Sequence, residues 1–99
     1  MQKRTIIAGQ LPVDVLREGK AFIAYCPVLD LPAAGTSYED ALEKFSVVSR
    51  AFIEELAKAE TLEEYLSEMG WSKVQGRWTP PVLVGHSEKA FSFPLQCPA

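Results

Sequence analysis

The sequence predicts an α+β domain: a small antiparallel sheet of three to four strands packed by one long helix, then a short second helix and a terminal β-hairpin. Three observations predict this fold. Phe22 to Cys26 is apolar throughout, which is typical of a central strand. Arg17 to Lys20 before it contains the glycine of a tight hairpin turn. A helical repeat of apolar residues begins after Gly35 and needs a sheet to cover it.

The amino-terminal stretch has the composition of β-structure. Thr5 to Ala8 and Leu11 to Leu16 both suit strands, but Gly9 and Pro12 interrupt them. Glycine in a strand often marks a bulge, and proline is confined to edges and strand starts. The sequence therefore allows either one long bent edge strand or two short strands, and the last of these should pair antiparallel with the central strand.

A long amphipathic helix is predicted from Thr36 onward. Thr36 and Glu39 have the spacing of a capping box, in which the threonine hydroxyl accepts from the Glu39 amide and the glutamate accepts from the Thr36 amide. Thr61 and Glu64 repeat this spacing, so a second, short helix should follow and end at Gly70. The apolar face of the long helix recurs at steps of three and four: Tyr38, Ala41, Leu42, Phe45, Val48, Phe52, Leu56 and Ala59.

The chain changes character after the second helix. Pro80 and Pro81 exclude helix, and two apolar stretches beyond them, Val82 to Val84 and Phe91 to Leu95, predict the terminal hairpin. The two tryptophans before it, at positions 71 and 78, are expected to cover the end of the core rather than to form an exposed anchor.

We divide the chain into an α/β core, residues 1–70, and an extension of the same domain, residues 71–99. One helix on three strands makes a thin core, so the apolar segment 81–95 should not stay in water. It could fold back onto its own sheet or pair across a two-fold axis with a second subunit. A homodimer is the favoured outcome, because two-fold homodimers are the commonest assembly.

Composition argues against several classes of function. A net charge of -3 and a pI near 5.1, without a Lys/Arg cluster, give no general attraction to nucleic-acid phosphate. The apolar stretch Ile6 to Ala8 behind Lys3 and Arg4 is too short for a signal peptide or a membrane span, so a cytoplasmic protein is expected. Cys26 and Cys97 lie far apart without CxxC spacing, which predicts reduced thiols and no zinc site.

No catalytic residue, metal or cofactor is assigned. Asp14, Asp30 and Glu39 are carboxylates that could serve metal-assisted hydrolysis, but they are better explained by a polar strand face, a turn and the capping box, respectively. His86 falls in the expected terminal turn without a neighbour at metal-ligand or triad spacing. Cys26 lies in an apolar strand and is expected to be a buried thiol.

One stretch resembles a known family. A strand that ends in Tyr25-Cys26-Pro27 is followed by Leu29 and Gly35-Thr36, and then by a helix that opens with Glu39 and Ala41-Leu42. In this order and spacing, residues 21–56 resemble the amino-terminal domain of HicB antitoxins. The resemblance implies a partial RNase H-like fold and a non-enzymatic protein that binds a small basic HicA-type ribonuclease toxin and covers its active site.

The chain departs from the family in one respect. Many members carry a carboxy-terminal helix-turn-helix or ribbon-helix-helix segment that binds operator DNA, whereas residues 71–99 show no such pattern, so DNA binding by this chain is doubtful. A solitary relative with another protein partner also fits. The alternative from a different class is an orphan RNase H-like domain that binds nucleic acid or retains nuclease activity, for which Asp14, Asp30 and Glu39 are the available carboxylates.

The candidate partner-binding site is the turn after the central strand. Tyr25, Pro27 and Asp30 are the candidate partner-binding residues, with Asp30 meeting a basic toxin surface. The same turn could also do no more than end the strand, and the sequence favours neither interpretation. Gly35, Thr36 and Glu39 form the helix-start motif.

Overall fold

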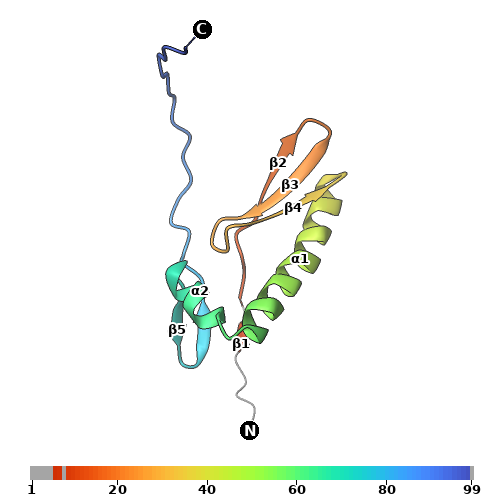
Figure 1. Cartoon of the computed structure of the whole chain (residues 1–99), viewed down its shortest axis with the longest axis vertical. Coiled ribbons are helices and arrows are strands. Elements are labelled where there is room, and N and C mark those ends of the chain that lie inside the picture. Colours follow the sequence, from red (N-terminus) through yellow and green to blue (C-terminus); the bar gives the residue numbers. More distant parts are fainter. Residues whose placement is uncertain (1–5, 8, 99) are drawn as a thin grey trace.

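The structure is a computed structural model that describes residues 6, 7 and 9–98 (Figure 1). It confirms the α+β fold: an antiparallel three-stranded sheet carries a long helix, and a short helix leads into a two-stranded hairpin. The elements in chain order are β1 (Ile6–Ile7), β2 (Asp14–Glu18), β3 (Ala21–Cys26), β4 (Leu31–Gly35), α1 (Tyr38–Lys58), α2 (Leu62–Glu68), β5 (Ser72–Val74) and β6 (Arg77–Thr79).

The main sheet has the strand order β2-β3-β4, and both pairs of strands are antiparallel. The predicted hairpin joins β2 to β3 through Gly19 and Lys20, and Gly19 adopts a φ of 63° that glycine tolerates without strain. The register places Val15, Ala24 and Ala33 side by side across the three strands. The apolar stretch predicted as the central strand is therefore the middle strand of the sheet.

Helix α1 covers one face of this sheet (Figure 1). Its buried residues Ala41 and Phe45 share the core with Ala24 and Cys26 of β3. The helix can begin close to β4 because Gly35 has no side chain: a Cβ there would lie 2.4 Å from the backbone nitrogen of Ala41. Glycine at this position therefore brings the helix onto the sheet.

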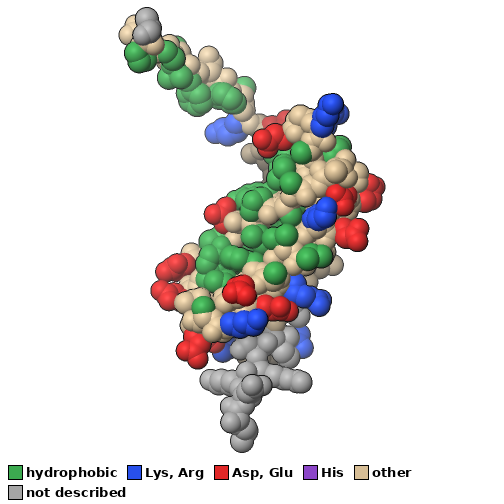
Figure 2. Space-filling view, turned by 45° about the vertical axis from the view of Figure 1, so that its right-hand side comes forward, with side chains coloured by type: hydrophobic (Ala, Val, Ile, Leu, Met, Phe, Trp, Pro, Cys, Tyr) green, Lys and Arg blue, Asp and Glu red, His purple; other side chains and the backbone are tan. Residues whose placement is uncertain are grey.

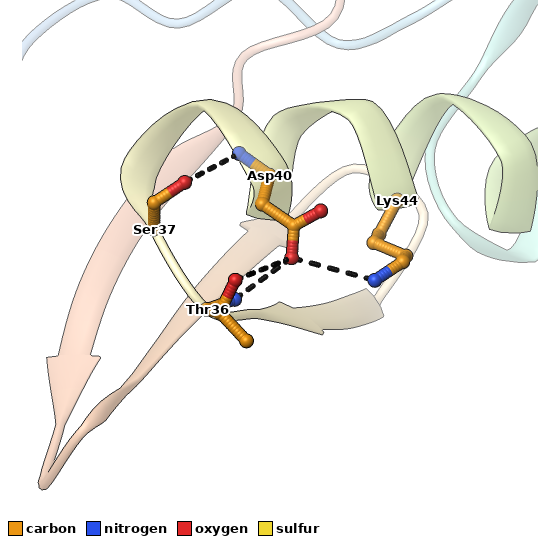
Figure 3. A network of polar contacts seen from close by, with 4 residues as sticks. All are labelled: Thr36, Ser37, Asp40 and Lys44. Atoms are coloured by element: carbon orange, nitrogen blue, oxygen red, sulfur yellow. Dashed lines mark hydrogen bonds and ion pairs between the residues drawn. The ribbon is translucent and has the colours of Figure 1, made fainter.

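The start of α1 differs from the predicted capping box by one residue (Figure 3). The N-cap is Ser37, whose hydroxyl accepts from the Asp40 amide at 3.1 Å. The Asp40 carboxylate accepts from the Thr36 amide at 2.8 Å and pairs with Lys44 at 3.3 Å. The predicted Thr36–Glu39 capping box was wrong. Thr36–Glu39 and Ser37–Asp40 have the same spacing, and the helix is capped through the second pair.

Helix α2 packs through Leu62 and Leu66, which are both buried. Its N-cap is Thr61, but the threonine side chain makes no capping hydrogen bond and instead donates to the carbonyl of Leu56 at 3.4 Å, so the predicted second capping box does not form. Gly70 follows the helix with a φ of 89°, as expected of a glycine at a helix end. Within the described residues, neither helix is long and apolar enough to cross a membrane.

A second small sheet has the order β1-β6-β5, with β1 parallel to β6. It resolves the choice left open at the amino terminus: β1 and β2 are separate short strands in different sheets. The terminal hairpin forms earlier than predicted, from β5 and β6, around Gln75 and Gly76, whose φ values of 50° and 78° suit a tight turn. The prediction of strands at Val82–Val84 and Phe91–Leu95 was wrong, because no strand occurs from residue 80 to 98.

The last described segment leaves the body of the protein. Residues 82–98, called the arm below, run as an extended chain beyond Pro81 (Figure 1), and the molecule measures 62 × 30 × 28 Å along its principal axes. Apolar side chains project from the arm into open space (Figure 2). Its large apolar residues are 71–96% exposed: Val82, Leu83, Val84, Phe91, Phe93 and Leu95.

Candidate interaction surface

The sheet face opposite α1 is uncovered in the described chain. Side chains alternate between the two faces of a strand, so the residues next to the α1-facing ones along each strand point away from the helix. None of these outward residues is buried, and Leu16 is 54% exposed. We call this surface the open face; it consists of Asp14, Leu16, Glu18, Ala21, Ile23, Tyr25, Pro32 and Ala34.

The register orders the open face into three rows, of which Glu18 and Ala21 form the one next to the β2–β3 turn. Leu16, Ile23 and Ala34 lie side by side across the three strands and form an apolar row. Asp14, Tyr25 and Pro32 form the next row, at the end of the sheet where β3 turns into β4. An apolar surface with an acidic and aromatic border is thus available to a partner.

The β3–β4 turn is fixed to the rest of the protein. Leu29, at the centre of the turn, is 1% exposed and belongs to the core. The indole N–H of Trp71 donates to the carbonyl of Val28 at 2.7 Å, and the hydroxyl of Tyr65 donates to the carbonyl of Leu29. Two backbone carbonyls of the turn are therefore held by side chains from α2 and from Trp71 just beyond it, which restricts the positions that the turn can adopt.

The structure brings the three predicted partner-binding residues together. The Tyr25 hydroxyl donates to the Asp30 carboxylate at 2.6 Å, and Pro27 is exposed at the start of the same turn. Asp30 has a φ of 52°, a left-handed conformation that aspartate tolerates better than most residues. The hydrogen bond to Asp30 raises the pKa of Tyr25, and desolvation and the Asp30 charge add to this effect.

Two acidic residues lie close to Tyr25 in the fold. Asp14 is its partner on β2, and Asp30 accepts its hydroxyl hydrogen bond. A cation over a tyrosine ring is attracted by the ring face, and two nearby carboxylates strengthen this attraction. This end of the open face is therefore suited to a lysine or arginine side chain of a partner.

The candidate nuclease carboxylates do not gather into a metal site. Asp14 and Asp30 border the open face, whereas Glu39 lies on α1, the helix that covers the opposite face. Among residues 6, 7 and 9–98, no three His, Cys, Asp or Glu side chains are placed to hold a metal ion. His86 lies in the exposed arm and not in a hairpin turn.

Cys26 and the two tryptophans occupy the positions expected from the sequence. Cys26 is fully buried and burial raises the pKa of its thiol, while Cys97 is exposed in the arm, and both are free thiols. Trp71 and Trp78 are each 6% exposed and belong to the core, which confirms that they cover its end.

Sequence reasoning missed a hollow beside α1. A cavity of about 530 Å³ lies between the middle of α1, the linker before β2 and the residues that flank the second sheet. No sequence signal predicts it, because its lining comes from separate stretches of the chain. We call it the α1 groove; its apolar lining includes Leu11, Leu29, Phe45, Ile53, Trp71 and Pro80.

Comparison of the chain with protein-family models, with curated proteins and with solved structures found no match.

Proposed function

We propose that this protein is a non-enzymatic, cytoplasmic antitoxin-like protein that binds and blocks a small basic ribonuclease of the HicA type. The observation that carries the proposal is the hydrogen bond of Tyr25 to Asp30 at the end of a sheet face that the described residues leave uncovered, with Asp14 as the register partner of Tyr25 on β2. The resemblance of residues 21–56 to HicB antitoxins indicates the class of partner. The overall charge of -3 favours a basic one.

The open face offers two kinds of contact to such a toxin. A lysine or arginine of the toxin would lie between Asp14 and Asp30, over the ring of Tyr25. Apolar side chains beside it would cover the row of Leu16 and Ile23. Because hydrogen bonds from α2 and Trp71 already hold the turn, little conformational entropy is lost when the complex forms.

The test is inhibition of a HicA-type ribonuclease encoded beside this protein. The full chain should co-purify with the toxin and suppress its RNA cleavage. Asp14→Asn with Asp30→Asn should slow association, and the remaining dependence of the rate on salt should be weaker, because exposed charges steer encounter and are screened over about 10 Å at 0.1 M salt. Glu43→Gln, on the exposed side of α1, is the matched control and should leave inhibition unchanged.

Two outcomes would contradict this proposal. A neighbouring toxin that does not bind at low salt removes the toxin assignment. Magnesium- or manganese-dependent RNA cleavage by the isolated protein, lost in Asp14→Asn or Asp30→Asn, would instead support the RNase H-like alternative.

We propose no DNA binding for this protein, and we expect it to be an oligomer. After α2 the described chain continues as a hairpin and the arm, which differs from the helical DNA-binding segments of HicB antitoxins. The exposed apolar arm supports the expectation that the protein forms a homo-oligomer, with a dimer as the simplest case.

A further inference from the structure

The arm and the α1 groove are two apolar surfaces that no other described part of the chain covers. We propose that the arm of one copy fills the α1 groove of a second copy, so that two chains exchange arms across a two-fold axis. The proposal rests on the homo-oligomer proposed above and names the surfaces that build it. It uses none of the open-face residues, so the surface assigned to the toxin stays available.

The end of the arm has the pattern of an inserting segment. Phe91, Phe93 and Leu95 alternate with Ser92 and Pro94, so in an extended chain the three apolar side chains share one side. The rings of Phe91 and Phe93 are 5.1 Å apart between centroids, which confirms that these two lie on the same side. They are 78% and 72% exposed. Such a row of apolar side chains needs an apolar surface to cover it.

The groove is lined by the apolar residues that such a row of side chains needs for its burial. Leu29, Phe45 and Trp71 line it and are core residues with 1%, 6% and 6% of their surface exposed, so the groove opens directly onto the core. Arg50 and Glu54 lie on its lining, and the arm carries Glu88 and Lys89, so both partners offer one charge of each sign. Apolar and charged groups are thus complementary between the two surfaces.

The geometry favours a second copy over the same chain. In the single chain the arm projects from its own body (Figure 1). None of the described arm residues lines the groove, although Pro80 at the root of the arm does. Between Pro81 and Phe91 an extended chain covers about 33 Å at about 3.3 Å per residue. The molecule measures only 30 and 28 Å across its two shorter axes. An arm can therefore cross a neighbouring body and reach its groove.

The area is sufficient for a stable dimer. Two exchanged arms contribute four phenylalanines, and at about 150–250 Å² each these alone bury about 600–1,000 Å². Stable interfaces bury about 1,200–2,000 Å² in total. The valines and leucines of both arms, together with the groove surface that they cover, bring the exchange into this range.

The first experiment measures mass in solution by sedimentation equilibrium. The full chain should be a dimer, and Phe91→Ala with Phe93→Ala should lose the dimer and give folded monomers by circular dichroism. Ser92→Ala, on the opposite side of the arm, is the control and should remain dimeric. A monomeric full chain, or a dimer unaffected by the double substitution, would overturn the proposal.

The second experiment uses Cys97, which lies two residues beyond Leu95 and is exposed. Glu54→Cys places a thiol in the groove, and Glu55→Cys places one next to it but outside the groove lining. Oxidation by diamide, which takes up the two hydrogens of the thiols, should give a covalent dimer several times faster for Glu54→Cys, and Cys97→Ser should abolish it.

The disulfide products of the oxidation experiment distinguish arm exchange from the other arrangements. A disulfide formed within one chain would show that the arm closes on its own groove, and equal rates for the two variants would show random collision; both contradict arm exchange. A dimer that persists without a groove crosslink leaves the proposed oligomer in place and removes only this assignment of its interface. Toxin inhibition is measured separately, so it does not affect either result.

Discussion

The hydroxyl of Tyr25 donates a 2.6 Å hydrogen bond to the carboxylate of Asp30, across the turn that joins β3 to β4. This bond is the largest cause of the raised Tyr25 pKa, since ionisation of the phenol would remove its hydrogen. The folded pKa therefore lies above the unfolded value of about 10. The stabilisation that follows is complete below that unfolded value and is lost as the pH rises through the folded pKa.

We expect Asp30→Asn to lower the pKa of Tyr25 toward its ordinary value, because the substitution removes the charge and weakens the acceptor. Asparagine also tolerates the left-handed backbone at this position. Titration of ¹³C-labelled tyrosine by NMR measures the change. Tyr65, whose pKa is raised mainly by burial and only secondarily by Asp30, should move less and serves as an internal control. An unchanged Tyr25 pKa would contradict this account.

The sheet and the long helix could be predicted from sequence because their signals are local. An apolar strand, a glycine hairpin turn and a helical repeat each depend on neighbouring residues. The orientation of α1 was less well predicted: Val48 was placed on the buried face but is 37% exposed, whereas Ile53, which was not, packs against the core. The prediction of the terminal strands failed because a strand needs a hydrogen-bonded partner strand, and the sequence does not show whether one is present.

The candidate site was only partly predictable for the same reason. Tyr25, Pro27 and Asp30 lie close together in sequence, so a turn sufficed to predict that they meet. The open face depends on the register between strands, which sets Asp14 beside Tyr25. The α1 groove depends on the packing of distant segments. Neither the open face nor the α1 groove can be predicted from a short sequence pattern.

Gly35→Ala should destabilise the protein, because the added Cβ would overlap the backbone of Ala41 at the start of α1. Overpacking of this kind costs about 1–3 kcal/mol. Urea unfolding monitored by circular dichroism measures the effect. Gly85→Ala is the matched control: nothing lies within 4 Å of its added Cβ, so its free energy of unfolding should stay within about 0.5 kcal/mol of wild type. Equal stability of the two variants would contradict the close approach.

Ser37→Ala should remove the N-cap of α1 and cost about 1 kcal/mol, since the Asp40 amide loses its acceptor. Glu39→Ala should cost less than about 0.5 kcal/mol, because Glu39 is an exposed residue outside the observed cap. Thermal unfolding of both variants distinguishes the observed Ser37 cap from the predicted Thr36–Glu39 capping box. If Glu39→Ala proved the more harmful, the helix would begin with the capping box predicted from the sequence.

Trp71 and Trp78 provide a matched pair for testing how the β3–β4 turn is held. Each is 6% exposed, but the indole N–H of Trp71 donates to the carbonyl of Val28 at 2.7 Å, whereas that of Trp78 is buried and has no partner among the described residues. Trp71→Phe removes a hydrogen bond and leaves a turn carbonyl without its donor, whereas Trp78→Phe removes a donor that bonds to none of the described residues. An unmade buried hydrogen bond costs about 1–3 kcal/mol.

We therefore expect Trp71→Phe to destabilise the protein by at least about 1 kcal/mol more than Trp78→Phe, although both lose the same volume. Urea unfolding measures the difference in the free energy of unfolding. Amide hydrogen exchange in the turn distinguishes a local effect from a global one: Leu29 and Asp30 donate backbone hydrogen bonds there, and their exchange should accelerate more in Trp71→Phe than the decrease in global stability explains. Equal costs and unchanged turn protection would show that Trp71 acts by packing alone.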